Sequence, residues 1–260
     1  MYPKNIEEKN REAWNEALQY HQKARNNVLQ KGFAENDFTV FNRDCDDVLI
    51  EKLKMINLSG KTIAQLPCNN GRELLSLMRF GAKEARGFDI SDLAIAEAKQ
   101  LAEISGLNAQ FERVNITEID GKFNNYFDFI YISEGSLQWF PDLGEYFSVI
   151  SRLLKKNGEV LIFEIHPCAY ILEHKTSYFD KGPFSYKNGM DYVGGIQYEA
   201  KECRWFMHTL SDIINAVIQC GISITEFNEY NLEMAGSESM VDVKDFPLSY
   251  ILTGKKNGRI

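Results

Sequence analysis

The pattern of apolar and polar residues changes near residue 60. Before it, Trp14, Ala17, Leu18 and His21 fall at positions i, i+3, i+4 and i+7, which is one face of a helix surrounded by charged residues. After Lys61, short apolar runs alternate with segments of helical period, and glycine or polar turn residues separate them. This alternation is typical of a parallel sheet with helices packed on it. The sequence therefore predicts a helical N-terminal region followed by an α/β fold.

The individual elements follow from the same pattern. Strands are predicted over Lys61–Leu66, Glu84–Asp89, Ala109–Val114, Phe127–Ser133, Glu159–Ile165, Ile222–Phe227 and Leu248–Gly254. Helices are predicted over Gly71–Phe80, from Asp92 to about Glu103, over about Asp142–Leu154, and from a cap at Thr209 or Ser211 to Cys220.

The pattern breaks after the fifth predicted strand. The next 40 or so residues are rich in aromatic residues and glycine: Tyr178, Phe179, Phe184, Tyr186, Tyr192, Gly194, Gly195 and Tyr198. Such a segment is too aromatic for a disordered linker, so we expect an ordered insertion, in the form of a β-ribbon. We thus predict a single domain with a helical cap (1–57), a core (58–166), an insertion or lid (167–208) and a C-terminal part of the sheet (209–260).

Composition and charge exclude several classes of protein. The chain has 260 residues, of which 44% are hydrophobic and 25% charged, as in globular proteins. Its formal charge of −8 gives no field that would attract nucleic acid or anionic lipid. The longest apolar runs, such as Val160–Phe163, are far shorter than the roughly 20 residues of a membrane span. We therefore expect neither a nucleic-acid partner nor a membrane segment.

The cysteines and the N-terminal residues indicate a compartment. Five scattered cysteines without a CxxC pair are typical of reduced thiols and fit neither a disulfide framework nor a metal site. The first ten residues contain no apolar stretch of the kind that a secretory signal needs. A cytoplasmic protein without a bound metal is the resulting expectation.

Ligands of parallel α/β sheets bind beyond the carboxyl ends of the strands, so the residues that follow each strand are the candidates for chemistry. Asp89 lies 18 residues after Gly71, the spacing at which an acid meets the ribose hydroxyls in nucleotide-binding units. Asn115 offers an amide to an adenine, and Ile90 and Ile116 could lie on either side of the base. Each residue also has a purely structural interpretation: Asp89 and Asn115 are common turn residues, and glycine and asparagine tolerate positive φ.

These residues, taken together, resemble a known family. The segment from about Lys61 to Glu164 looks like the core of class I S-adenosylmethionine-dependent methyltransferases. Asp89 matches the ribose-binding acid, Asn115 the adenine-side position, Phe127–Ser133 the fourth-strand motif, and Leu153–Gly158 the turn before the fifth strand. Glu164–Pro167 and Trp205–His208 are similar to motifs of a sub-group of bacterial methyltransferase-like proteins.

The resemblance implies a Rossmann-like, seven-stranded, mostly parallel sheet with helices on both faces. It also implies S-adenosylmethionine as the cofactor and methyl transfer to an unidentified small-molecule acceptor. The expected cofactor-binding residues lie after the first four strands: Gln65, Pro67, Asn69, Gly71, Asp89, Ile90, Asn115, Ile116 and Ser133.

The first loop departs from the family signature of an acid followed by three alternating glycines. Gln65 replaces the acid, Pro67 and Asn69 replace the first two glycines, and Gly71 is retained. Two alternatives therefore stay open: a non-catalytic protein of the same fold that binds S-adenosylmethionine or a nucleoside and acts in regulation, and an enzyme that uses the sulfonium in another way. A dinucleotide oxidoreductase is disfavoured because no GxGxxG is present.

The reaction implied is displacement at the sulfonium methyl, with a general base only where the acceptor must lose a proton. His166 is the candidate base, and Glu164 could orient it. Glu134, Trp139 and His208 are the candidate acceptor-binding residues. A hydrogen-bonded structural role is the alternative for each histidine, and a core or capping role for the other two. The aromatic insertion suits both a lid over the site and the surface of a homodimer.

Overall fold

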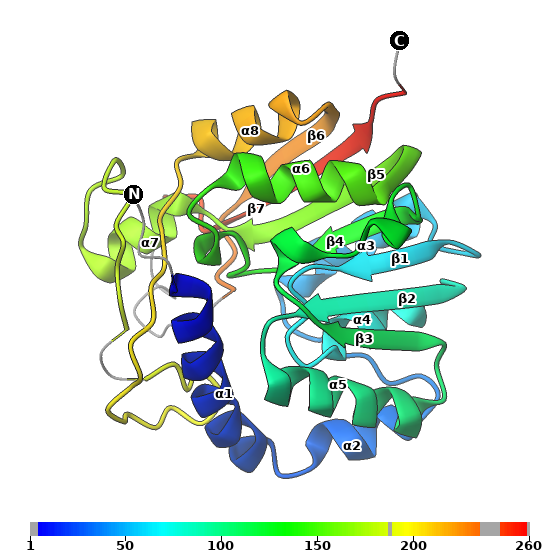
Figure 1. The fold of residues 1–260 in the computed structure, drawn as a ribbon, viewed down its shortest axis with the longest axis horizontal. Helices are drawn as coiled ribbons and strands as arrows, with labels where there is room; N and C mark the ends of the chain where they lie inside the picture. The colour runs from blue at the N-terminus through cyan, green and yellow to red at the C-terminus, as the bar shows by residue number, and fades with distance from the viewer. Residues whose placement is uncertain (1–4, 187–188, 235–244, 259–260) are drawn as a thin grey trace.

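The sheet predicted from the sequence is present. The structure, a computed structural model, describes residues 5–186, 189–234 and 245–258. Its seven strands lie in the order β3-β2-β1-β4-β5-β7-β6, and β7 runs antiparallel to both of its neighbours (Figure 1). The strands are β1 (Thr62–Gln65), β2 (Glu84–Asp89), β3 (Ala109–Arg113), β4 (Phe127–Ile132), β5 (Leu154–Ile165), β6 (Ile222–Tyr230) and β7 (Ser249–Lys256). The Rossmann-like, mostly parallel architecture is thereby confirmed.

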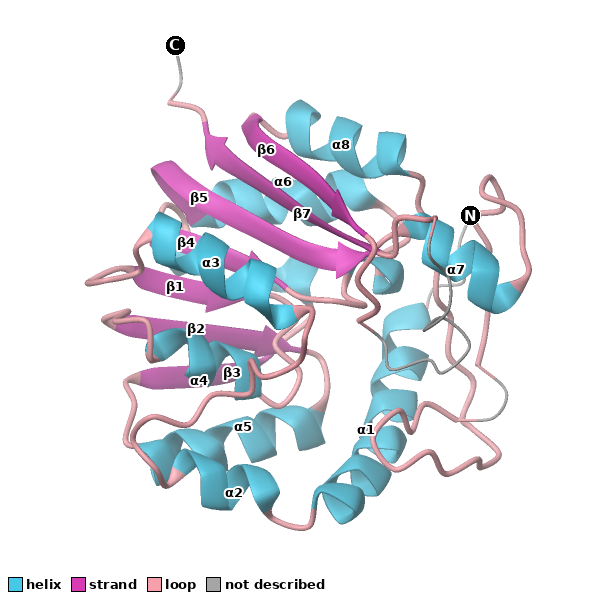
Figure 2. Cartoon of the chain, turned by 180° about the vertical axis from the view of Figure 1, so that it is seen from behind, coloured by secondary structure: helices cyan, strands magenta, loops and turns pink. Residues whose placement is uncertain are grey.

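Helices cover both faces of this sheet (Figures 1 and 2). On one face lie α2 (Val28–Phe33), α3 (Asp46–Ile56), α4 (Arg72–Met78) and α5 (Asp92–Ser105); on the other lie α6 (Leu143–Leu153) and α8 (Leu210–Gln219). The remaining helices are α1 (Ile6–Arg25) and α7 (Pro167–His174), with 3₁₀ turns η1 (Ile116–Glu118), η2 (Gly121–Phe123) and η3 (Leu137–Trp139).

The period of two in the strands divides the hydrophobic core. Successive residues of β1, Ile63 and Ala64, are both fully buried but belong to opposite layers. The same alternation places Phe129 of β4 with Ile63, and Ile130 with Ala64. Side chains of a strand point alternately to its two faces, so a strand buried on both sides is apolar throughout. This explains why the central strands appear in the sequence as continuous apolar runs.

Helix starts follow the capping residues that the sequence provides. The Ser91 side chain accepts a hydrogen bond from the N–H of Ala94 and begins α5. Of the two predicted caps for α8, the structure uses Thr209, which forms a capping box with Asp212.

Two expectations about the second half were wrong. β5 begins at Leu154 rather than at Glu159, because an irregularity in its pairing with β4 absorbs the predicted turn, with Asn157 at φ 62°. The insertion is not a β-ribbon: it opens with α7, and the rest of its described chain is irregular apart from an isolated bridge between Phe184 and Trp205. Its aromatic residues pack on one another and on α1, which makes ladder pairing unnecessary for order.

The insertion and α1 are held together along their length. The amide of Asn10 exchanges two hydrogen bonds with the backbone of Arg204, and the ring of Tyr20 stacks on that of Tyr198 with centroids 4.2 Å apart. Nε2 of the buried His21 lies 2.8 Å from the carbonyl oxygen of Met190. Burial lowers the pKa of His21 to about 4, so this ring is neutral at pH 7 and donates.

Helix α1 is also anchored to the sheet layer. The side chains of Arg11 and Asn15 donate to the carboxylate of Asp92 at the start of α5, and the Ser91 hydroxyl donates to Asn15. These contacts place α1 beside the carboxyl ends of β1, β2 and β4 (Figure 1). Within the described ranges, no helix combines the length and apolar character that crossing a bilayer requires.

Gly71, at the start of α4, sits in a crowded part of this arrangement. Its φ is +74°, and a Cβ there would lie 2.6 Å from the ring of Phe111 and 2.9 Å from the Cβ of Ala98. Gly106 ends α5 at φ +64°, but a Cβ there would meet nothing within 4 Å.

We expect Gly71→Ala to lower the free energy of unfolding by about 1–3 kcal/mol more than Gly106→Ala does. Both substitutions strain a left-handed residue by a similar amount, so the difference isolates the steric overlap with Phe111 and Ala98. Urea denaturation of the two variants measures it. Equal losses would show that the neighbours of Gly71 yield without cost.

Candidate functional site

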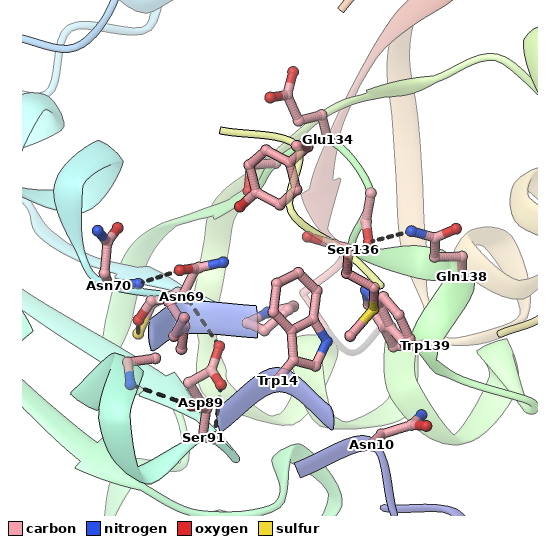
Figure 3. Close-up of a pocket in the computed structure, with 18 of the residues that line it drawn as sticks. Asn10, Trp14, Asn69, Asn70, Asp89, Ser91, Glu134, Ser136, Gln138 and Trp139 are labelled. Atoms are coloured by element: carbon pink, nitrogen blue, oxygen red, sulfur yellow. Dashed lines mark hydrogen bonds between the residues drawn. The ribbon is translucent and has the colours of Figure 1, made fainter. Parts of the chain in front are cut away.

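A cavity of about 1030 Å³ lies between the carboxyl edge of the sheet and the pair formed by α1 and the insertion. Its floor is made by the loops that follow β1, β2, β3 and β4, and its other walls by α1, α7, Tyr186 and residues 189–197. Trp14 projects from α1 into the space between Asp89 and Trp139 (Figure 3). Strand order reverses between β1 and β4, so the cavity is at the position where parallel α/β folds bind their ligands.

Asp89 connects two of the floor loops. Its Oδ2 accepts a hydrogen bond from the N–H of Asn69, at 2.8 Å, and its Oδ1 accepts one from the N–H of Ser91, at 2.9 Å. Burial raises the pKa of this carboxyl, against the backbone donors that lower it. The residue is 8% exposed and lines the cavity. Ile90, which follows it, lines the same wall.

Asn115 and Ile116 follow β3 and also line the cavity. The Asn115 side chain accepts from the N–H of Thr117, at 3.3 Å, and thereby caps η1. Ile116 is 3% exposed. The structure therefore brings together the acid and the amide whose spacing in the sequence suggested a nucleoside site.

The loop after β1 keeps a tight course without the family's glycines. Asn69 adopts φ 47°, the left-handed conformation that asparagine tolerates best after glycine. Pro67 and Asn69 line the cavity, whereas Gln65 and Gly71 are absent from its described lining. The amide group of the buried Gln65 donates to Glu73, at 2.7 Å, and to Ser133, at 3.1 Å.

The loop after β4 is held by a buried carboxylate. Glu164 of β5 accepts hydrogen bonds from the N–H groups of Gly135, Ser136 and Leu137. Burial raises the pKa of Glu164 to about 7, although these backbone donors lower it. Glu164 therefore positions this loop and does not orient His166, which was its expected role.

Glu134, on that loop, lines the cavity and is paired with Arg43. Nη1 of Arg43 lies 2.7 Å from one carboxylate oxygen of Glu134 and 2.9 Å from the other, while the same guanidinium contacts Asp46. The Glu134 side chain is 19% exposed. Burial raises its pKa to about 7, and the nearby Glu73 also raises it, against the charges of Arg43 and Arg72.

Aromatic residues make the opposite wall. The rings of Trp14 and Trp139 meet edge to face with centroids 5.3 Å apart, and Tyr186 and Tyr192 lie beside them. Trp139 therefore lies in the wall opposite Asp89 and Asn115. The sequence predicts that Trp139 contacts the acceptor.

Neither predicted histidine belongs to the cavity lining in the described part of the chain. Nδ1 of His166 accepts from the N–H of Cys168 and caps α7, while its Nε2 lies 2.9 Å from Glu229 of β6. Nε2 of His208 lies 2.9 Å from the carbonyl oxygen of Phe140. Both are the hydrogen-bonded structural histidines that the sequence had left as the alternative. We therefore assign no catalytic role to His166 and no acceptor contact to His208.

Several charged residues of the cavity lining were missed, among them Arg25, Arg43, Arg72 and Glu73. Glu73 and Arg72 directly follow the predicted first loop, so their charges at a helix start were a usable signal. Arg25 and Arg43 reach the site through the packing of the N-terminal region, which the sequence pattern does not reveal. Among the described residues, no group of histidine, cysteine or carboxylate side chains is arranged to hold a metal ion.

Comparison with known proteins agrees with this geometry. A family model described as a methyltransferase domain matches residues 57–205. The chain is 26% identical over 173 residues to methyltransferase phqN of Penicillium fellutanum, covering 65% of this chain and 48% of that protein. It is 26% identical over 131 residues to a tRNA U34 carboxymethyltransferase of Aliarcobacter butzleri, covering 48% of this chain and 42% of that protein. The match thus spans less than half the length of either relative.

The fold also resembles that of known methyltransferases. A solved structure described as a putative S-adenosylmethionine-dependent methyltransferase from Listeria monocytogenes superposes with a TM-score of 0.63 at 16% identity. The match covers 80% of this chain and 96% of that one. The family model matches more than half of the chain, and the cofactor of the family is S-adenosylmethionine. The chain therefore belongs to the class I S-adenosylmethionine-dependent methyltransferase family.

Proposed function

We propose that this protein transfers the methyl group of S-adenosylmethionine to a small-molecule acceptor bound in the cavity described above. The observation that carries the proposal is the pairing of two surfaces in one cavity. Its floor, with Asp89 and Asn115, is suited to a nucleoside, and it faces an aromatic wall with Trp14 and Trp139. A floor of this kind is suited to a cofactor, and the opposite wall is suited to a second, partly apolar molecule.

The residues present fit the cofactor. Asp89 would accept from the ribose hydroxyls, Asn115 would pair with the adenine, and Ile90 and Ile116 would contact its faces. The bound cofactor supplies an electrophilic methyl group on a sulfonium. The chain's contribution is to hold the acceptor in line with that methyl and to exclude water, for which the aromatic wall and α1 are placed.

A small acceptor is favoured over a nucleic acid. The wall opposite the floor combines Trp139, Tyr186 and Met190, and α1 together with the insertion lies over the strand ends. The net charge of −8 also disfavours a polyanion. The relative named as a tRNA-modifying enzyme matches only 48% of this chain, so its substrate is not carried over.

Where the acceptor must lose a proton, we assign Glu134 as the base. It is the carboxyl of the loop after β4 that faces the cavity, and Arg43 holds it there with two short contacts. The other charged groups around it are Glu73 and Arg72 of α4.

A homodimer formed through the insertion stays a prediction.

The first test is calorimetric titration with S-adenosylmethionine. We expect Asp89→Asn to weaken binding about 10- to 100-fold, because hydrogen bonds to a charged group contribute roughly 1.5–3 kcal/mol and each factor of ten is about 1.4 kcal/mol. Substituting the exposed Asp37 by Asn is the matched control and should leave the affinity unchanged. Equal affinity of the Asp89 variant and the wild type would contradict the nucleoside assignment, and binding without turnover of any acceptor would favour the regulatory alternative.

The second test is the pH dependence of methyl transfer to an acceptor found by screening. A carboxyl acts as a base only when ionised, so the rate should rise with pH through about 7, as Glu134 loses its proton. Glu134→Gln should remove this rise and lower kcat by about 10²- to 10⁴-fold, as measured by release of S-adenosylhomocysteine. The exposed Glu103→Gln variant should keep the wild-type profile. An unchanged profile in the Glu134 variant would remove it from the mechanism.

A further inference from the structure

Several buried polar groups near the loop after β1 have no protein partner. Oε1 of Gln65 and both side-chain polar atoms of Asn70 are shielded from solvent without a hydrogen bond to any described residue. Nη1 and Nη2 of Arg25 are shielded as well, and the Arg25 guanidinium interacts with the side chain of Tyr192. Asn70 and Arg25 also line the cavity. Buried polar groups without partners are costly and uncommon, so such a set beside a cavity points to a polar ligand that satisfies them.

Glu73 supplies a negative charge at this place. It lies in the first turn of α4, lines the cavity, and its side chain is 12% exposed. The amide group of Gln65 donates to it at 2.7 Å. The carboxylate that the family signature has at position 65 is therefore replaced, in this chain, by one that reaches the same point from α4.

Arg72 and Arg25 supply positive charge beside it. Nη2 of Arg72 lies 3.8 Å from Oε1 of Glu73, and Nη1 of Arg25 lies 4.0 Å from Glu97, a distance too long for a hydrogen bond. Burial lowers the pKa of Arg25, and so does the charge of Arg72, whereas the side chain of Tyr192 raises the pKa of both arginines. Both arginines line the cavity, where an anion would interact favourably with them.

We infer that Glu73 binds the α-ammonium group, and Arg25 and Arg72 the α-carboxylate, of the methionine end of S-adenosylmethionine. The inference rests on the proposed function. It assigns the contacts to the methionine end of the cofactor, because the loop after β1 lacks the acid and two of the glycines of the family signature. The two charged groups of an amino acid are attached to one carbon, and Glu73 and Arg72 present the complementary charges side by side. Asn69, which donates to Asp89, links this cluster to the ribose side of the site.

A carboxylate on the acceptor is the rival occupant of the arginine pair. The position of the pair favours the cofactor, because Arg72 and Glu73 directly follow the loop whose residue Asn69 contacts the ribose-binding acid. The neighbouring orphan amides of Gln65 and Asn70 also suit a ligand with both donors and acceptors.

The experiment is a set of calorimetric titrations with four ligands that share the methylthioadenosine part of the cofactor. S-adenosylmethionine has both charged groups of the amino-acid end, its decarboxylated form has only the ammonium, and its 2-oxo acid analogue has only the carboxylate. 5′-Methylthioadenosine has neither, and as a thioether it also lacks the sulfonium charge. The variants are Glu73→Gln, which can still accept from Gln65, and Arg25→Gln. Arg86→Gln on β2 and Glu103→Gln on α5 are charge-matched controls, since both lie outside the described cavity lining.

We expect a crossed pattern. Glu73→Gln should weaken the two ligands that carry an ammonium by about 10- to 100-fold and leave the 2-oxo acid within about twofold. Arg25→Gln should weaken the two ligands that carry a carboxylate by a similar factor and leave the decarboxylated form within about twofold. Neither variant should change the affinity for 5′-methylthioadenosine, which also shows that the variants are folded. Arg25→Lys should recover part of the loss.

Other outcomes overturn the inference in distinguishable ways. If the wild type binds S-adenosylmethionine and both variants bind it equally well, the assignment fails while the proposed function stands, and Arg25 is left to a carboxylate on the acceptor. Uniform weakening of all four ligands would assign Glu73 and Arg25 to folding of the loop. If the wild type binds none of the four, the inference and the proposed function fail together.

Discussion

The carboxylate of Asp89 joins the first two loops of the site by accepting a backbone N–H from each, at Asn69 and at Ser91. The first half of the floor depends on this double contact. It fixes the loop after β1 against the start of α5, and α5 in turn anchors α1 through Asn15. Because the same carboxylate is the group proposed to receive a ribose, the loop and the cofactor would share one acceptor. Cofactor binding and the order of the loop would then be coupled.

Glu164 holds the other side of the floor in the same manner. It accepts three backbone N–H groups from the loop after β4, where Glu134 is displayed. Loops at a sheet edge leave N–H groups without partners, and a buried carboxylate satisfies several of them at once. The family signature achieves close backbone approach with glycines. This chain retains Gly71, and obtains an ordered floor from side chains of Asp89 and Glu164.

The sequence predicted those features whose signal is local. The sheet, its helices and the pair Asp89 and Asn115 follow from periodicity and from positions after strands, and the structure places them accordingly. His166 shows the limit of that reasoning: a histidine at a strand end suggests chemistry, yet the following Pro167 is typical of the first position of a helix, and His166 is its N-cap. The aromatic insertion was predicted to be ordered, but its irregular course depends on contacts with α1.

Arg25 and Arg43 reach the cavity only through tertiary packing, so no spacing in the sequence links them to the loops.

The packing around Phe111 has a consequence for how this chain can vary. The ring of Phe111 lies under both Gly71 and Gly87, so close that a Cβ on either glycine would overlap it. The glycine retained from the signature is thus fixed by the aromatic ring packed against it. Positions 71, 87 and 111 should change together during divergence, with a larger residue at either glycine tolerated only where the ring has been replaced by a smaller side chain.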